Sequence, residues 1–235
     1  MIFGNLVFDN FVREIFNKFW MNHTYLFPNG SILSNTVQRT LNRVFKNDDV
    51  DQLSEIIAEG IAPNSKFSNF NVKTCNIFST NTPIISVAAY YSALQCITSL
   101  IQIGVRIDSK DFNGQTVAHF AVASGNLECT QLLSNFGVDF SDCLFIAADC
   151  GNFEMFMWLY STQKTNLSSR KDDRTCLLHH AAKSKNMKLT NYLLKEMESC
   201  LTLSDIQEVS AMLSNSNSEY SSSPEDSDDS SDISF

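Results

Sequence analysis

The feature that most constrains the fold of this chain is a two-helix unit encoded between Asp111 and Asp139 (DFNGQTVAHFAVASGNLECTQLLSNFGVD). Small apolar residues at 118–122 predict a short first helix that ends at Gly125, since glycine adopts the left-handed conformation of a helix end at little cost. A second apolar stripe over 127–136 predicts another helix, which ends at Gly137. Helices this short cannot bury their apolar faces against each other alone, so the unit requires stacked copies of itself.

Copies of this unit occur on both sides of the stretch. The upstream copy ends its second helix at Gly104, which lies 33 residues before Gly137. In the downstream copy Gly151 follows Gly125 by only 26 residues, which predicts that about one hairpin finger is missing between these two copies. The apolar residues that mark the copies are Ala88, Ala89, Leu100 and Ile101 upstream and Ala147, Ala148, Trp158 and Leu159 downstream.

Two less regular copies complete the series. The last one contains Thr175 and His179, and Lys185 stands where glycine is expected, so the end of its first helix is less clearly marked. In the first copy Asn35 and Gln38 predict a capping box. The apolar residues that follow with helical spacing before Gly60 are Val37, Leu41, Val44, Phe45, Val50, Leu53, Ile56 and Ile57.

The most regular copy, at 111–139, resembles an ankyrin repeat. Its Thr116, His119 and Ala121 follow the T-P-L-H-x-A signature of that family, with Val117 in place of the proline. The resemblance covers residues 34–195 and implies an all-α dominated ankyrin-repeat solenoid of stacked helix-turn-helix units with short β-hairpin fingers. The expected repeats are residues 34–60, 82–110, 114–139, 142–163 and 175–195.

Three segments before and between the repeats need separate interpretation. Residues 1–33 include an amphipathic stretch at 6–20, interpreted as a helix that caps the exposed end of the stack. A helix that binds a partner or a membrane surface is the alternative. The insert at 61–81 predicts an extended hairpin or long finger, with a mobile loop as the alternative. Residues 161–174 predict a further exposed finger of mixed charge.

The chain after the last repeat divides into a helix and an acidic tail. Ser204 and Gln207 predict a capping box at the start of a C-terminal capping helix within 196–213. This helix is expected to turn Ile206, Val209 and Leu213 to one side. Residues 214–235 contain ten serines and dense acid, so they cannot bury enough apolar surface to offset their ordering entropy. We expect this tail to be disordered.

Charge and cysteine content limit the partners and the compartment. The chain carries a net charge of −9, but six of its acidic residues lie in residues 215–235, which contain no basic residue. The remainder is close to balanced and has no basic stripe, so nucleic-acid binding is not expected. Seven cysteines without paired spacing favour reduced thiols and a cytoplasmic location, with the nucleus as an alternative. No run of about 18 apolar residues occurs, so no membrane span is expected.

The sequence contains no constellation that indicates catalysis, a metal or a cofactor. By the resemblance, His119 hydrogen-bonds the backbone in its turn and is not a base. The adjacent His179 and His180 point away from each other and have no third ligand nearby, so a zinc site is not expected. Cys143 and Cys150 are interpreted as small core residues. An unrecognised hydrolase that uses Cys150 or His179 is kept as a third class of function.

The resemblance implies a surface for a partner protein. In ankyrin proteins partners contact the hairpin tips and the outward residues at the end of each first helix, which line a concave groove. Rigid aromatic residues are enriched in interface hot spots, which makes Tyr90, Tyr91 and Phe112 the main candidates. Alternatively, one of the tyrosines packs against the finger at 61–81. The matching positions are Tyr90, Tyr91, Lys110, Phe112, Asn113, Gln115, Ala123, Ser124, Asp149, Cys150, Lys183 and Ser184.

The expected function is therefore the non-enzymatic binding of another protein, of unknown identity, by a monomer with no cofactor. The alternative is an adaptor or effector that acts on a basic partner through its acidic C-terminal tail. Ser222 and Ser223 are candidate phosphorylation sites in that tail, because each has an acidic residue three positions later.

Overall fold

A computed structural model describes residues 31–72, 77–163, 167–171 and 175–218. The chain forms two compact units, which divide between Asn166 and Leu167. We call them the N-terminal and the C-terminal unit. The predicted helix at 6–20 lies outside the described residues, as do residues 219–235 of the predicted acidic tail. The prediction that the tail is disordered from residue 214 is wrong for residues 214–218, which belong to the helix Leu203–Ser218.

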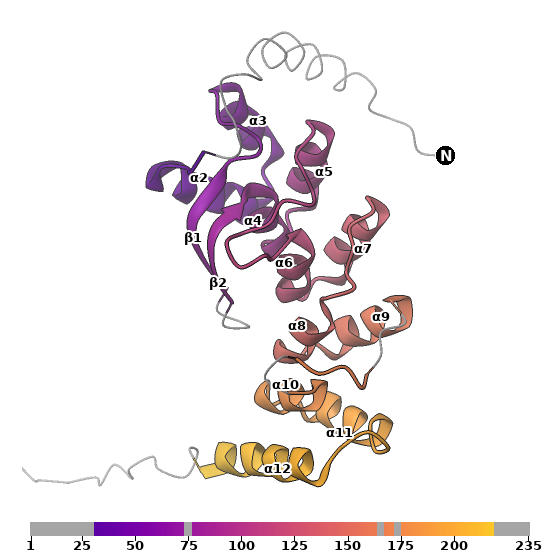
Figure 1. Ribbon diagram of the computed structural model, residues 1–235. Helices are drawn as coiled ribbons and strands as arrows, with labels where there is room; N and C mark the ends of the chain where they lie inside the picture. The colour runs from indigo at the N-terminus through magenta and orange to yellow at the C-terminus, as the bar shows by residue number, and fades with distance from the viewer. Residues whose placement is uncertain (1–30, 73–76, 164–166, 172–174, 219–235) are drawn as a thin grey trace, which may run out of the picture. The chain divides into compact units, whose positions relative to one another are not determined.

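The N-terminal unit is built from consecutive pairs of short helices and one β-hairpin. Figure 1 shows α4, α6 and α8 in one row and α5, α7 and α9 in a second row beside it. The fold class predicted from the sequence is confirmed by this arrangement. The helices are α2 (Asn35–Asn47), α3 (Val50–Ala58), α4 (Ile84–Tyr90), α5 (Leu94–Gln102), α6 (Val117–Ser124), α7 (Leu127–Asn135), α8 (Leu144–Asp149) and α9 (Phe153–Gln163).

The hairpin consists of β1 (Lys66–Val72) and β2 (Ile77–Pro83), which pair antiparallel with Phe70 opposite Ser79. It confirms the predicted finger at 61–81 in place of a mobile loop. Gln38 of α2 ties the hairpin to the first helix pair, since its side-chain amide donates to the Leu33 carbonyl at 2.7 Å and to Ser68 Oγ at 3.0 Å.

The predicted cap of α2 was placed one residue too late. Ser34 is the N-cap, and its hydroxyl accepts from the Val37 N–H at 3.4 Å. Gln38, the other half of the predicted capping box with Asn35, is instead buried and used in the contact with the hairpin. Three adjacent polar residues offered the same local bond, and the packing of the hairpin selected among them.

The C-terminal unit contains α10 (Leu177–Lys183), α11 (Met187–Glu196) and α12 (Leu203–Ser218). Within it α10 packs against both other helices. The predicted cap of the last helix was also misplaced, because Thr202 and Asp205 cap α12 and the predicted Ser204–Gln207 box does not form. The predicted inward face was partly wrong as well: Val209 is buried, whereas Ile206 is 45% exposed.

Small buried residues allow the first helices of successive pairs to approach closely. Ala88, Ala121 and Ala147 occupy matching places in α4, α6 and α8, each four residues before the left-handed residue of its pair, and none has any exposed surface. Ala181 occupies the same place in α10 of the C-terminal unit and is also fully buried. A larger side chain at these places would push neighbouring helices apart, since protein interiors are packed at nearly crystalline density. Within the described residues, no helix is both long and apolar enough to cross a lipid bilayer.

In each pair, the turn between the two helices contains one residue in the left-handed conformation. Gly125 has a φ of 77° and Gly151 a φ of 64°, as the sequence predicts. Asp48, Ser92 and Lys185 adopt the same conformation, with φ of 50°, 56° and 60°. The uncertain helix end at Lys185 therefore has the same geometry as the ends marked by glycine, but with a side chain that disfavours it.

Replacing Lys185 by glycine is expected to stabilise the C-terminal unit by about 0.5–1 kcal/mol, because the substitution removes the left-handed strain and adds a smaller backbone entropy cost. Urea unfolding monitored by circular dichroism measures the change. Lys183→Gly is the matched control: Lys183 is an exposed, right-handed residue of α10, so glycine there should destabilise the unit. Equal losses of stability in the two variants would contradict the interpretation.

Candidate functional site

An aromatic cluster joins the hairpin to the helices of the N-terminal unit. The Phe70 ring lies 5.3 Å from that of Tyr90 and 6.0 Å from that of Tyr91, both edge-on. Its centroid is also 6.2 Å from that of Phe120 in α6. Both tyrosines are half-buried, and burial, followed by the neighbouring Tyr90, raises the pKa of the Tyr91 hydroxyl. The two tyrosines therefore hold the hairpin in place and are only partly available to a partner.

A buried carboxylate fixes the loop at 110–115 beside the hairpin. Asp111 is 7% exposed and accepts from Ser79 Oγ of β2 at 2.6 Å. The other carboxylate oxygen accepts from the backbone N–H groups of Asn113 at 2.8 Å and Gln115 at 2.7 Å. Thr82 is also within 2.6 Å of Ser79. These bonds hold one turn of backbone in a single conformation against the strand.

Phe112 lies on this fixed loop with most of its side chain in solvent. Its backbone N–H donates to the Thr80 carbonyl at 2.9 Å, and the ammonium of Lys66 donates to the Lys110 carbonyl at 3.0 Å. Phe112 is nevertheless 77% exposed, the largest fraction among the exposed hydrophobic residues that the structure describes. A large apolar ring is thus presented to solvent by a backbone that has little freedom left.

The remaining predicted contact residues fall into different environments. Ala123 is only 2% exposed, so the prediction that it contacts a partner is wrong. Ser124 sits at the end of α6, where its hydroxyl donates to the Ala121 carbonyl at 2.7 Å. Ser184 repeats this bond to the Ala181 carbonyl in the C-terminal unit. Both serines therefore have a structural role in ending their helices.

Cys150, another predicted contact residue, is disulfide-bonded. The expectation that all seven cysteines are reduced thiols is wrong for this residue, and a sulfur held in a disulfide is not a thiolate nucleophile. Five other cysteines are free, and Cys96, Cys129 and Cys143 are buried. Burial is the main cause that raises the pKa of these three thiols, to about 12 for Cys129. Such thiols are poor nucleophiles.

His119 has the structural role that the resemblance implied. Its Nδ1 accepts from the Thr116 backbone N–H at 3.2 Å and lies 3.1 Å from Thr116 Oγ1, which closes a capping box at the start of α6. Burial lowers the pKa of the imidazole, while the carboxylates of Asp142 and Asp111 oppose the shift. The neutral His119 ring, whose Nδ1 already accepts a hydrogen bond, therefore acts as a cap of α6.

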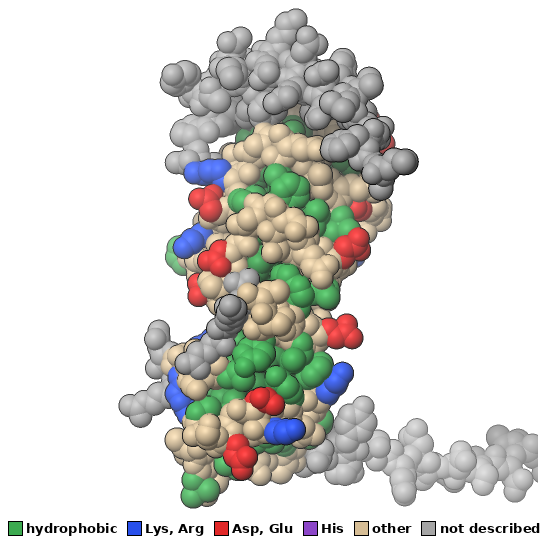
Figure 2. Space-filling view, turned by 90° about the vertical axis from the view of Figure 1, so that its right-hand side faces the viewer, with side chains coloured by type: hydrophobic (Ala, Val, Ile, Leu, Met, Phe, Trp, Pro, Cys, Tyr) green, Lys and Arg blue, Asp and Glu red, His purple; other side chains and the backbone are tan. Residues whose placement is uncertain are grey.

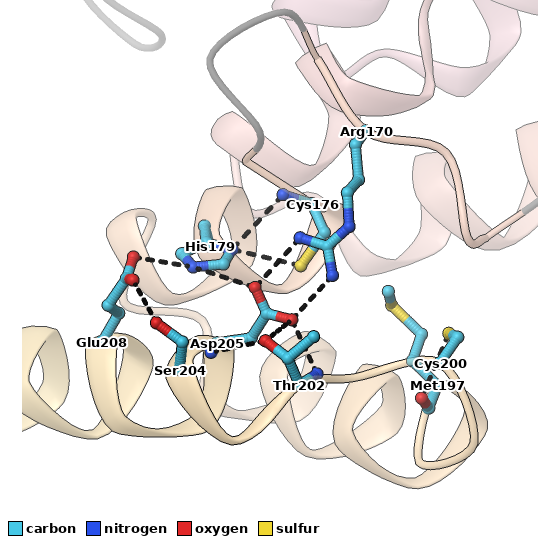
Figure 3. A network of polar contacts seen from close by, with 9 residues as sticks. All are labelled: Arg170, Cys176, His179, Met197, Cys200, Thr202, Ser204, Asp205 and Glu208. Atoms are coloured by element: carbon cyan, nitrogen blue, oxygen red, sulfur yellow. Dashed lines mark hydrogen bonds and ion pairs between the residues drawn. The ribbon is translucent and has the colours of Figure 1, made fainter.

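The C-terminal unit contains a polar network that sequence reasoning did not find (Figure 3). The Nη1 and Nη2 atoms of Arg170 donate to Oδ1 and Oδ2 of Asp205, at 3.0 Å and 2.7 Å. The same carboxylate accepts from the Thr202 backbone N–H at 2.8 Å. The Arg170 hydrogen bonds are the largest of the causes that lower the pKa of Asp205 far below its usual value. The only signal of this network in the sequence was the Thr202-x-x-Asp205 spacing, which is that of a capping box.

His179 connects this network to the last repeat. Its Nδ1 accepts from the Cys176 backbone N–H at 3.3 Å and lies 3.1 Å from Cys176 Sγ. On the other side of the ring, Nε2 is 3.3 Å from Glu208 and 3.9 Å from Asp205. Since Nδ1 accepts a hydrogen bond, Nε2 carries a proton and donates toward these carboxylates. His179 therefore ties α10 to α12.

The donor set of this network does not fit a metal ion. Ligand atoms of Cys176, His179 and Asp205 lie within 4.8 Å of one another, next to a pocket of about 480 Å³ lined by polar residues. However, both Asp205 oxygens bind the Arg170 guanidinium, and His179 Nδ1 accepts from a backbone N–H. A metal cation would have to displace a bound cation and break a helix cap.

The face shown in Figure 2 carries basic side chains singly, among acidic, hydrophobic and other residues. No continuous basic stripe is visible among the described residues on this face. A surface that binds nucleic acid needs several Lys or Arg side chains placed to neutralise successive phosphates. This face does not provide that arrangement.

The stacked helix pairs, with an alanine-lined first helix and a left-handed residue between helices, define a helical repeat protein. Residues 41–142 match the family model described as ankyrin repeats, in three copies. A search of curated proteins gave no match for the chain. The pairs α8–α9 and α10–α11 lie beyond the matched residues. In the C-terminal unit, Cys176 and His179 form a capping box like that of Thr116 and His119 in the N-terminal unit.

Proposed function

We propose that this chain is a non-enzymatic binding module that contacts a partner protein through the concave face of its ankyrin repeats. Ankyrin repeats are generally modules for protein–protein interaction. The observation that carries the proposal is Phe112, an aromatic side chain 77% exposed on a loop whose backbone is fixed by Asp111. The neighbouring Tyr90 and Tyr91 contribute the exposed parts of their rings.

The fixed loop favours binding because the entropy of ordering it is already lost in the free protein. A partner that covers the Phe112 ring gains the burial of a large apolar side chain without immobilising the backbone beneath it. Aromatic residues in such positions are enriched among interface hot spots, and their truncation costs about 2 kcal/mol or more of binding free energy.

Affinity capture from lysate tests this proposal with wild-type chain and two matched variants. Phe112→Ala is expected to lose at least one partner that the wild type retains. Phe136→Ala is the control, because Phe136 is another exposed aromatic residue of the N-terminal unit, at the end of α7. It should retain every partner. If Phe112→Ala captures the same proteins as the wild type while remaining folded, the proposal is wrong.

A second function is supported by the charge of the C-terminal segment. Residues 214–235 contain six acidic residues and no Lys, Arg or His. We propose, as the alternative, an adaptor that binds a basic partner through this segment, strengthened by phosphate on Ser222 or Ser223. Ionic strength separates the two functions, because binding through the acidic segment should weaken steeply with salt and binding at Phe112 should not. A chain ending at Ser218 should lose only the salt-sensitive partners.

A further inference from the structure

A second exposed apolar side chain, Ile32, lies beside Lys66 of the hairpin. Ile32 is 60% exposed and forms a parallel bridge with Lys66. In this bridge the Lys66 N–H donates to the Ser31 carbonyl at 3.0 Å, and the Leu33 N–H donates to the Lys66 carbonyl at 2.9 Å. Because side chains alternate along a strand, residues paired in this way point to the same face. The Ile32 side chain therefore stands next to the stem of Lys66.

The ammonium group of Lys66 reaches the fixed loop that carries Phe112. It donates to the Lys110 carbonyl at 3.0 Å, two residues before Phe112. The Phe112 N–H is in turn bound to the Thr80 carbonyl of β2, and Figure 1 shows the loop that precedes α6 beside this strand. The exposed residues on the hairpin and on the loop are thus connected through one lysine. We call Ile32, Lys66, Lys110 and Phe112 the hairpin–loop surface.

The Lys66 ammonium keeps its charge and part of its hydrogen-bonding capacity at this place. An ammonium group has three N–H donors, and a backbone carbonyl carries no formal charge to balance it. The bond to the Lys110 carbonyl is exposed to solvent. Among the residues that the structure describes, Lys66 forms no ion pair. The bond therefore fixes the position of the ammonium without neutralising it.

The other charged side chains of the loop leave an excess of positive charge. Arg106, Asp108 and Lys110 are exposed, and the charges of Arg106 and Asp108 offset each other. The Asp111 carboxylate is buried in the loop, where its oxygens accept from Ser79 and from two backbone N–H groups. The exposed charge beside Phe112 thus comes from Lys66 and Lys110. A carboxylate complements this surface better than an ammonium group does.

We propose that the hairpin–loop surface binds a segment of a partner protein in which a carboxylate lies close to a large apolar side chain. Phe112 and Ile32 cover the apolar side chain, and the ammonium groups of Lys66 and Lys110 form charge-assisted hydrogen bonds with the carboxylate. This inference deepens the function proposed above for Phe112 and rests on it.

Two other occupants fit this surface less well. A second copy of this chain in a symmetric dimer would place Lys66 and Lys110 opposite the same lysines of the other copy, and like charges repel. A nucleic acid requires basic side chains that neutralise successive phosphates, and two ammonium groups provide little of that arrangement.

The test uses the full-length chain and synthetic peptides of about ten residues that contain leucine and glutamate at several spacings among glycine and serine. In the matched peptides lysine replaces glutamate. Titration followed by nuclear magnetic resonance measures weak affinities and shows whether the Phe112 amide responds. The proteins are wild type, Phe112→Ala, Lys66→Met, Lys110→Met and the control Lys46→Met. Lys46 is an exposed lysine in the last turn of α2.

Wild type and Lys46→Met are expected to bind the best glutamate peptide about fivefold more tightly than its lysine counterpart. Lys66→Met and Lys110→Met should each reduce this preference to about twofold, and added salt should reduce it in the wild type. Lys110→Met retains the backbone carbonyl that binds Lys66, so its effect does not depend on a change in the loop.

The outcomes separate this inference from the function on which it rests. If glutamate and lysine peptides bind equally well and Phe112→Ala weakens both, the inference is wrong and the function of Phe112 stands. If the peptides bind Phe112→Ala as tightly as the wild type, both are wrong. If no peptide binds, the inference is wrong, and the captured partners of Phe112→Ala decide the function. A wild-type dimer in sedimentation, lost in Phe112→Ala, would overturn the inference in favour of self-association.

Discussion

Replacing Asp205 by alanine is expected to lower the free energy of unfolding of the C-terminal unit by about 2–3 kcal/mol. The substitution removes a buried carboxylate, leaves the guanidinium of Arg170 without this partner and deletes the cap of α12. Breaking a buried ion pair costs about 3–5 kcal/mol. Because the Arg170 side chain is 33% exposed and can be rehydrated, the expected loss is smaller than this range, at about 2–3 kcal/mol. Urea unfolding and the hydrogen exchange of α12 amides measure the loss.

The pH dependence of stability gives an independent measurement of the same interaction. The pKa of Asp205 in the fold is lowered from its unfolded value of about 4. Its ionised form therefore stabilises the fold above that pH, and the stabilisation is lost as the pH falls toward the folded pKa. Asp205→Asn should remove this part of the acid sensitivity. An unchanged acid profile would show that the ion pair is not important for stability.

Glu208→Ala is the control for the Asp205 variants. Its carboxylate also contacts His179, but its side chain is 58% exposed. An exposed charge of this kind contributes about 0–1 kcal/mol. Equal destabilisation by the Glu208 and Asp205 variants would contradict the central position assigned to Asp205.

Replacing Phe70 by alanine is expected to lower the free energy of unfolding of the N-terminal unit by about 3 kcal/mol, in the range typical of buried Phe→Ala changes. Phe70 is 6% exposed and its ring contacts Tyr90, Tyr91 and Phe120. Without it, the hairpin loses its main aromatic contact with α4 and α6. Thermal and urea unfolding measure the loss, and hydrogen exchange should show faster opening of β1 and β2.

Phe112→Ala is the matched control for this change. The side chain is 77% exposed, and its backbone bond to Thr80 is retained by alanine, so stability should change by no more than about 0.5 kcal/mol. Comparing the Phe70→Ala and Phe112→Ala variants thus separates an effect on folding from an effect on binding. If Phe70→Ala left the unfolding free energy unchanged, the hairpin would have to be held by other contacts.

Much of the fold could be predicted because it depends on local signals. The glycines at 125 and 151 marked the ends of first helices, and recurring apolar residues marked the helices themselves. Helix periodicity and the backbone preference of glycine act within one or two turns. The caps of α2 and α12 were misplaced for the opposite reason. Several neighbouring polar residues could each form the local bond, and long-range packing chose among them.

The candidate sites were less predictable than the fold. The exposed Phe112 was identified correctly as a surface aromatic residue, because the ankyrin signature fixed its position relative to Thr116. The roles of Tyr90 and Tyr91 could not be assigned, since whether they faced a partner or the finger depended on where Phe70 lay. Ala123 looked accessible from its position at the end of a helix, but its neighbours bury it.

By itself the sequence determined the repeated helix pairs, the hairpin between the first two and the acidic composition of the C-terminal segment. Only the tertiary structure decided that Arg170 and Asp205, 35 residues apart, would form an ion pair that orients α12. It likewise decided that Ile206 would face solvent and Val209 the interior. The physical reason is that periodicity defines an apolar stripe, whereas the rotation of a helix is fixed by contacts with distant residues.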